Sequence, residues 1–130
     1  MYSNVDRCGW VDHSKGDLLE QWDVSALWES SKWIKPHEVD VADVKARCSG
    51  GWLDYLPSLQ HFEVAPEVKR LEAADLSYPI ILHPAGWVMD GYHRIGKAFM
   101  QGHEKIWAVQ FTDGSLPLPA VVIPNYLNRY

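Results

Sequence analysis

Cysteine is scarce in this chain of 130 residues, which has only Cys8 and Cys48 and no Cys-x-x-Cys spacing. Small secreted proteins that depend on disulfides carry several paired cysteines, and structural zinc sites need closely spaced Cys or His ligands. No two of the six histidines stand four residues apart, as the ligands of a helical zinc site do. We therefore expect two free thiols in a reducing compartment.

Long apolar runs are also missing. Residues 1–7 are polar and lack the apolar core of a signal peptide. No stretch approaches the length of about 20 apolar residues that spans a membrane. A Walker phosphate loop and a Gly-x-Ser-x-Gly nucleophile turn are absent as well. These absences predict a cytoplasmic protein with no membrane partner.

An excess of positive charge is the third absence. The net charge is −5 and the isoelectric point is about 5.6, whereas proteins that bind nucleic acid through its phosphates are usually basic. A nucleic-acid partner is therefore not expected. Apolar residues make up 47% and charged residues 22% of the chain, which is ordinary for one soluble globular domain.

What the chain does contain is a strand–turn–helix–strand pattern between residues 78 and 111. Three apolar runs bounded by Gly, Pro or Asp predict strands, at Pro79–Leu82, Trp87–Met89 and Lys105–Phe111. From Tyr92 to Gln101 the apolar spacing becomes helical, and Gly102 suits the left-handed residue that ends a helix. The inner face of this helix is expected to consist of Ile95, Ala98 and Phe99.

The turn before this helix carries the main functional signal. Asp90 stands where an N-cap is expected, and Gly91 allows close approach of a ligand to the backbone. The free amides of a helix start attract anions, and His93 and Arg94 add donors in the same turn. This pattern predicts a phosphate site. The alternative is structural: Asp90 only caps the helix, and His93 and Arg94 are solvated.

The segment resembles the ParB/sulfiredoxin-like superfamily, which includes the nucleotide-binding domain of ParB, sulfiredoxin and ADP-dependent free serine kinases. The matching residues are Pro79–Leu82, Val88 to Arg94, Ala98, Gly102 and Ile106 to Val109. The resemblance implies a small α+β fold with a mixed sheet and flanking helices. It further implies that ADP, ATP or CTP binds at Gly91, Tyr92, His93 and Arg94, with Mg²⁺.

The resemblance also suggests catalytic roles. His93 would stabilise charge on a transferred phosphoryl group, and Asp90 would act as metal ligand or base. Glu38, in the stretch Lys35-Pro36-His37-Glu38, matches the catalytic glutamate of the free serine kinases. However, strand-like residues follow Glu38 instead of preceding it, which favours an exposed glutamate before a strand. Tyr92 replaces the cysteine of sulfiredoxin, so that enzyme's nucleophilic chemistry is excluded.

The rest of the chain gives a simpler prediction. Residues 1–16 are expected to form an irregular arm, and Asp17 to Ser30 are expected to form a helix. We therefore expect residues 1–32 to be an N-terminal addition and residues 33–130 to be the ParB/sulfiredoxin-like domain. Residues 38–41 alternate like a strand, although a helical turn can begin at Val41. A further helix is expected from Pro66 to Ala74, and an edge strand from Ala120 to Ile123.

Three functions are compatible with the sequence. The first is a nucleotide-phosphate-binding domain, acting as a small phosphotransferase or NTP hydrolase on an acceptor that the sequence does not identify. The second is a non-catalytic protein-binding module, from a mobile element or phage, that uses the seven tryptophans and the acidic surface. The third is a ParB-like nuclease.

Overall fold

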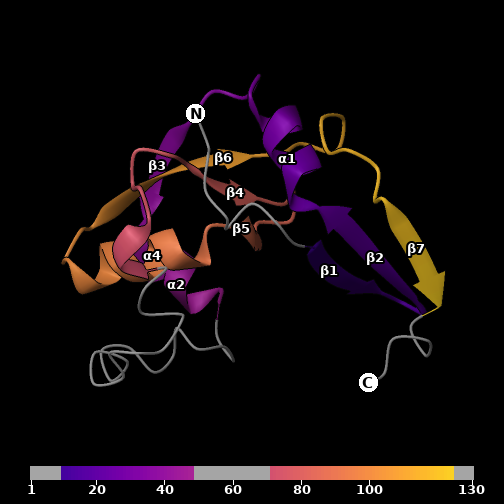
Figure 1. The fold of residues 1–130 in the computed structure, drawn as a ribbon, viewed down its shortest axis with the longest axis horizontal. Coiled ribbons are helices and arrows are strands. Elements are labelled where there is room, and N and C mark those ends of the chain that lie inside the picture. The colour runs from indigo at the N-terminus through magenta and orange to yellow at the C-terminus, as the bar shows by residue number, and fades with distance from the viewer. Residues whose placement is uncertain (1–9, 49–70, 125–130) are drawn as a thin grey trace.

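The computed structural model describes residues 10–48 and 71–124, which form two β-sheets with helices packed against them (Figure 1). The predicted α+β class is confirmed. None of the helices in these two stretches is long and apolar enough to cross a membrane. In chain order the elements are β1 Trp10–Lys15, β2 Leu18–Asp23, α1 Val24–Ser31, β3 His37–Asp40, α2 Val41–Ala46, β4 Ile80–Leu82, β5 Val88–Asp90, α4 Tyr92–Met100, β6 Lys105–Gln110 and β7 Val121–Pro124.

The larger sheet has four strands in the order β3-β6-β4-β5. Strands β4 and β6 run parallel, and β3 and β5 pair antiparallel at the two edges. The sheet is therefore mixed, as predicted, and strands β4, β5 and β6 and helix α4 begin and end within about one residue of the expected bounds. Both expectations near Val41 are confirmed, because β3 ends at Asp40 and α2 begins at the next residue.

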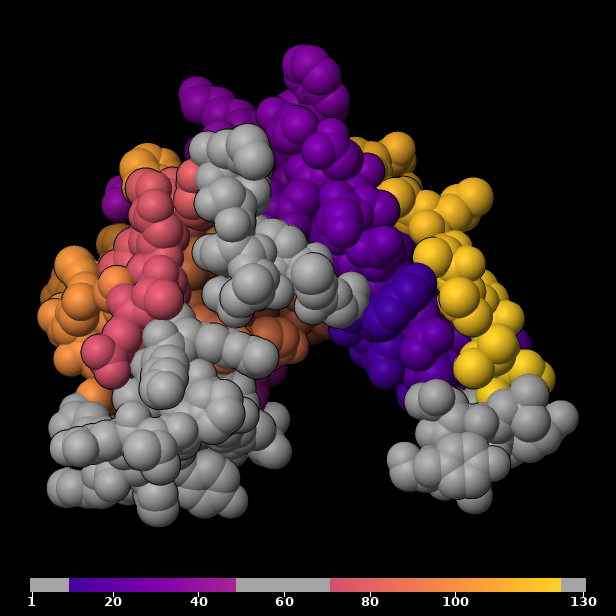
Figure 2. Space-filling model, viewed as in Figure 1, coloured from indigo at the N-terminus to yellow at the C-terminus, as the bar shows by residue number. Residues whose placement is uncertain are grey.

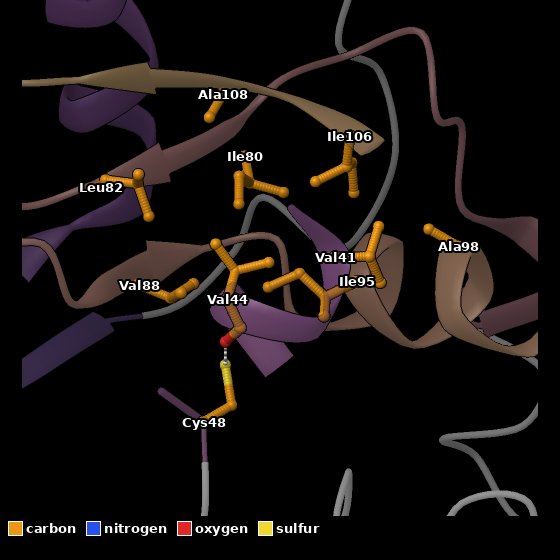
Figure 3. Close-up of a cluster of buried hydrophobic side chains, with 10 residues drawn as sticks. All are labelled: Val41, Val44, Cys48, Ile80, Leu82, Val88, Ile95, Ala98, Ile106 and Ala108. Carbon is orange, nitrogen blue, oxygen red and sulfur yellow. Dashed lines mark hydrogen bonds between the residues drawn. The ribbon is translucent and has the colours of Figure 1, made fainter. Parts of the chain in front are cut away.

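Each face of this sheet is covered by helices. On one face, α2 and α4 enclose the core shown in Figure 3, which consists of Val41, Val44, Cys48, Ile80, Leu82, Val88, Ile95, Ala98, Ile106 and Ala108. The predicted inner face of α4 is correct for Ile95 and Ala98, but Phe99 is 38% exposed. Ile95 and Ala98 thus form the buried face of α4, and Phe99 lies at the edge of that face.

Helix α1 covers the opposite face. Its side chains pack with those of the sheet in a second core, made of Trp22, Val24, Leu27, Trp28, Ile81, Met89, Val109 and Phe111. Because Val109 faces α1 while Ile106 and Ala108 face α2 and α4, β6 is buried on both sides over much of its length. Lys105 and Trp107 are the exposed residues of β6, and 45% of the Trp107 surface is exposed.

The N-terminal prediction is wrong in two places. Residues 10–15 form strand β1 instead of an irregular arm, and β2 occupies most of the first half of the expected helix. Strand β2 lies between β1 and β7, so hydrogen bonds to both neighbours outweigh the helical spacing of its apolar residues. Helix α1 starts only after Asp23, whose carboxylate accepts the Ser25 amide at 2.9 Å.

The edge strand expected near Ala120 is confirmed as β7. Its pairing with β2 joins the N-terminal segment to the C-terminal part of the chain. In the space-filling view of Figure 2 this three-stranded sheet forms an arm on the right, with α1 between it and α4. The N-terminal residues 10–31 are therefore integrated into the fold through β7 and the second core.

Some expectations lie outside the described residues, namely those for Cys8, residues 1–9, the start of the helix expected at Pro66, and the tail after Pro124. Residues 71–73, near the end of that helix, are helical. Cys48 is a free thiol, as expected, and is buried. Its Sγ donates to the Val44 carbonyl at 3.3 Å, which Figure 3 shows as a dashed line.

Candidate functional site

The expected phosphate site lies where β5 passes into α4. Asp90 is the last residue of β5, and Gly91 is the helix N-cap, with a left-handed φ of 112°. The expectation that Asp90 caps the helix is wrong, because no side chain makes a capping hydrogen bond at Gly91. The first amides of this nine-residue helix therefore receive no acceptor from a capping side chain.

Packing against β4 explains why residue 91 is glycine, and the sequence alone did not show this. It is buried, and a Cβ at this position would lie 2.5 Å from Ile80 Cγ2 and 3.1 Å from Ile80 Cα. Together with the positive φ, this close contact with β4 requires glycine. The missing side chain thus makes room for Ile80, whereas we had expected it to make room for a ligand.

The burial of Arg94 differs most from what the sequence predicted. We expected it to be exposed and to face solvent, but it is buried, with 4% of its surface exposed. Its Nη2 donates to Asp90 Oδ2 at 2.8 Å, and its guanidinium lies 5.1 Å from the centre of the Trp28 ring. Asp90 therefore already compensates the charge of Arg94, and a phosphate that used Arg94 would have to disrupt a buried ion pair.

Tyr92 and His93 present the accessible side chains of the first turn. Tyr92 is 40% exposed, and its hydroxyl donates to the Val88 carbonyl at 2.9 Å. Partial burial, with smaller contributions from Cys48 and Asp90, raises the pKa of the Tyr92 phenol, so Tyr92 remains a neutral donor. His93 is half-buried as a residue, and its ring atom Nε2 is buried.

Asp90 does not fit the role of a magnesium ligand in this arrangement. One carboxylate oxygen accepts a hydrogen bond from Arg94, and the positive guanidinium repels a cation at that position. Within residues 10–48 and 71–124, no three His, Cys, Asp or Glu side chains gather into a metal-binding group. We therefore assign no step to a metal ion at Asp90.

Glu38 does not converge with Asp90. It is exposed on β3, at one edge of the four-stranded sheet, while Asp90 belongs to β5 at the other edge. Strands β6 and β4 lie between them, which separates the two backbones by three strand spacings, or about 14 Å. Glu38 is therefore an exposed strand residue, and it does not join Asp90 in the catalytic arrangement that the resemblance to free serine kinases suggested.

A surface hollow of about 570 Å³ lies at the far end of α4. It is lined by residues of the β3–α2 junction and of the turn after α4, namely Asp40, Val41, Ala42, Asp43, Phe99, Gly102, His103 and Glu104. Three of these side chains are carboxylates, which repel phosphate. Asp40 and Asp43 are moreover paired with Lys105 and Arg47. This hollow is therefore a poor candidate for a nucleotide site.

A ring cluster between the two sheets was not found by sequence reasoning. Trp87 stacks against His13 and His83, with ring centres 4.6 and 4.5 Å away, and Trp22 meets His83 edge-on at 6.2 Å. His13 Nδ1 lies 3.6 Å from Glu20 Oε1. These residues come from β1, β2 and the β4–β5 turn, and no spacing in the sequence links them.

Fewer groups at the β5–α4 junction can contact a ligand than the motif suggested. Backbone amides of the first turn can contact an anion, while the Tyr92 hydroxyl is already bonded to the Val88 carbonyl and the Asp90–Arg94 pair holds the turn in place. Neither Glu38 nor a metal ion at Asp90 adds a base or a Lewis acid here. No protein-family model, no curated protein and no solved structure matches the chain.

Proposed function

We propose that this chain is a nucleotide-binding domain that holds phosphate groups at the first turn of α4. The observation that carries the proposal is the helix start itself, where Gly91, a left-handed N-cap residue that has no side chain, follows a strand directly. The backbone amides and the dipole of a helix start attract an anion at such a point. The resemblance of residues 79–109 to the ParB/sulfiredoxin-like superfamily points to the same turn.

The proposal gives the motif residues different roles than the motif alone did. In this proposal the amides of Tyr92 and His93 contact the phosphate, and the His93 side chain adds a donor. Asp90 and Arg94 form a buried pair with no net charge, so they neither attract nor repel the ligand to a first approximation. Their contribution is to fix the turn from which the amides project.

The proposal names a nucleotide di- or triphosphate, such as ADP, ATP or CTP, as the ligand class. Transfer or hydrolysis of a phosphoryl group would use His93 to stabilise developing charge, because it is the one basic side chain of the first turn outside the Asp90–Arg94 pair. The phosphate acceptor is left open, since Glu38 lies on the opposite edge of the sheet.

Thermal unfolding with each nucleotide, with and without Mg²⁺, tests this proposal. A ligand at about 100 times its Kd stabilises the native state by about 2.7 kcal/mol. A domain of this size should then melt several degrees higher. His93→Glu should remove the shift, because a carboxylate in the first turn competes for the amides and repels phosphate.

Gln101→Glu is the matched control for this variant. It adds the same charge at the exposed C-terminal end of α4, far from the proposed site. The nucleotide-dependent shift should survive in Gln101→Glu and be lost in His93→Glu. If no nucleotide raises the melting temperature, or if both variants respond alike, phosphate binding at this turn is refuted.

The exposed Trp33 favours a second candidate, a protein-binding module. Its surface is 90% exposed in the segment between α1 and β3, and tryptophan is enriched in the centres of protein interfaces. If this ring serves a partner and not the core, Trp33→Ala should change the free energy of unfolding by less than about 0.5 kcal/mol. Trp28→Ala, at a residue 6% exposed, should cost about 3–5 kcal/mol in the same urea titration. Equal losses would place Trp33 in the core and remove this candidate.

A further inference from the structure

The two sheets meet at the ring cluster of His13, Trp22, His83 and Trp87. His13 and Trp22 belong to the three-stranded sheet, and the other two belong to the β4–β5 turn of the four-stranded sheet. The stacking of Trp87 on both histidines therefore connects β1 with this turn. Since an unperturbed imidazole titrates near neutral pH in water, the contact contains groups that acid can charge.

His83 is held in its neutral form by a backbone hydrogen bond. Its Nδ1 accepts the amide N–H of Ala85 at 3.0 Å, so this nitrogen cannot carry a proton in the observed turn. A proton on Nδ1 would point at the Ala85 hydrogen and turn an attraction into a repulsion. The carbonyl of His83 also accepts from the Gly86 amide at 2.8 Å and from Gln110 Nε2 at 3.2 Å, which fixes the residue in place.

The surroundings of His83 add to this preference. Burial, followed by the charge of His13, lowers the pKa of His83 below its ordinary value of 6.5, and Lys15 acts in the same direction. Glu20 and Asp113 oppose the shift with smaller effects. Glu20 also lies close to His13, so it partly compensates a positive charge on that ring. The charged groups facing His83 thus come from β1, β2 and the loop after β6.

We propose that the stacked rings of His13, Trp87 and His83 form an acid-sensitive contact that holds the three-stranded sheet against the β4–β5 turn. Protonation of His83 breaks the hydrogen bond from Ala85 and places a positive charge beside the ring of His13. The turn then loses its geometry, and Trp87 loses its stacking partners. The contact is closed at neutral pH and opens in mild acid, independently of any nucleotide.

The direction of the pH effect follows from proton binding. Because the folded state binds a proton at His83 less readily than the unfolded chain does, stability rises with pH over this range. The contribution of His83 is complete above about pH 6.5 and is lost as the pH falls through the range below it.

Histidine titration by NMR on the intact chain tests the proposal directly. His83 should titrate below 6.5, and the amide resonances of β1 and β2 should shift along the same curve, because the arm moves as the contact opens. A titration at or above 6.5 would overturn the proposal. So would a low titration that leaves the resonances of β1 and β2 unchanged.

His83→Asn gives an independent test. An Asn side chain can accept the amide two residues on, as His83 Nδ1 does, but it cannot be protonated in this range. Between pH 7.5 and pH 5, the melting temperature of the unmodified chain should fall about 4 °C further than that of the variant. His103→Asn, at an exposed turn residue, is the control and should behave like the unmodified chain. Equal pH dependence in the unmodified chain and His83→Asn would overturn the proposal.

Discussion

Gly91→Ala is expected to lower the free energy of unfolding by roughly 3–5 kcal/mol, the largest loss we expect from a single methyl group in this chain. The new Cβ would lie 2.5 Å from Ile80 Cγ2, in a fully buried part of the core. The backbone φ of 112° is also strained for any residue with a side chain. Both effects require β4 and the start of α4 to move apart, and urea titration measures the cost.

Gly102→Ala separates the two effects. Gly102 has a positive φ of 77°, but a Cβ there meets no atom within 4 Å. Its substitution should cost only the backbone term, about 1–2 kcal/mol. The difference between the two variants then measures the contact with Ile80. Similar losses would mean that Ile80 moves aside freely and that the close approach of β4 to α4 is not a constraint.

Arg94→Ala is expected to destabilise the fold by about 3–5 kcal/mol, since it leaves the largely buried carboxylate of Asp90 without its guanidinium. It also removes the guanidinium from the face of the Trp28 ring. The double variant Asp90→Ala with Arg94→Ala should lose less than the sum of the two single variants, because the second change removes a charge already deprived of its partner. Urea titrations of all four proteins give the coupling energy.

The pair Arg47–Asp43 is a matched control for Arg94–Asp90. Both pairs are four residues apart with 2.8 Å between nitrogen and oxygen, but the Arg47 and Asp43 side chains are 39% and 56% exposed. Asp43→Ala should cost less than about 1 kcal/mol, while Asp90→Ala should cost several times more. Similar small losses would show that Arg94 is accessible to solvent and could bind phosphate directly, as the motif first suggested.

The central unit could be predicted because its signals are local. Pro79, the Pro84–Gly86 turn and Gly91 delimit the strands, and the spacing from Tyr92 gives the helix without reference to distant residues. Strand β2 could not be predicted this way. Its Leu18, Leu19 and Trp22 fit a helix as well as a strand, and the decision comes from pairing with β7, far along the chain.

The site shows the same division between local and distant causes. That Asp90 and Arg94 are four residues apart was visible in the sequence, but their burial depends on elements distant in sequence, including Trp28 of α1. The ring cluster was invisible for the same reason, since His13 and Trp87 meet only after the two sheets have docked. The motif predicted the turn between β5 and α4 correctly as a structural element, and it assigned the wrong exposure to Arg94.

The pairing of β2 with β7 has a consequence for the order of folding during synthesis. Strand β2 occupies residues 18–23 and β7 residues 121–124, so the three-stranded sheet cannot be completed until residue 124 has emerged from the ribosome. Contacts between such distant segments form slowly, because a long loop must close first. Until then one edge of β2 has no partner, and the growing chain exposes Leu18 and Leu19 on an open strand. We expect nascent chains stopped before β7 to bind chaperones that capture open strands, and chains extended past Pro124 to be released.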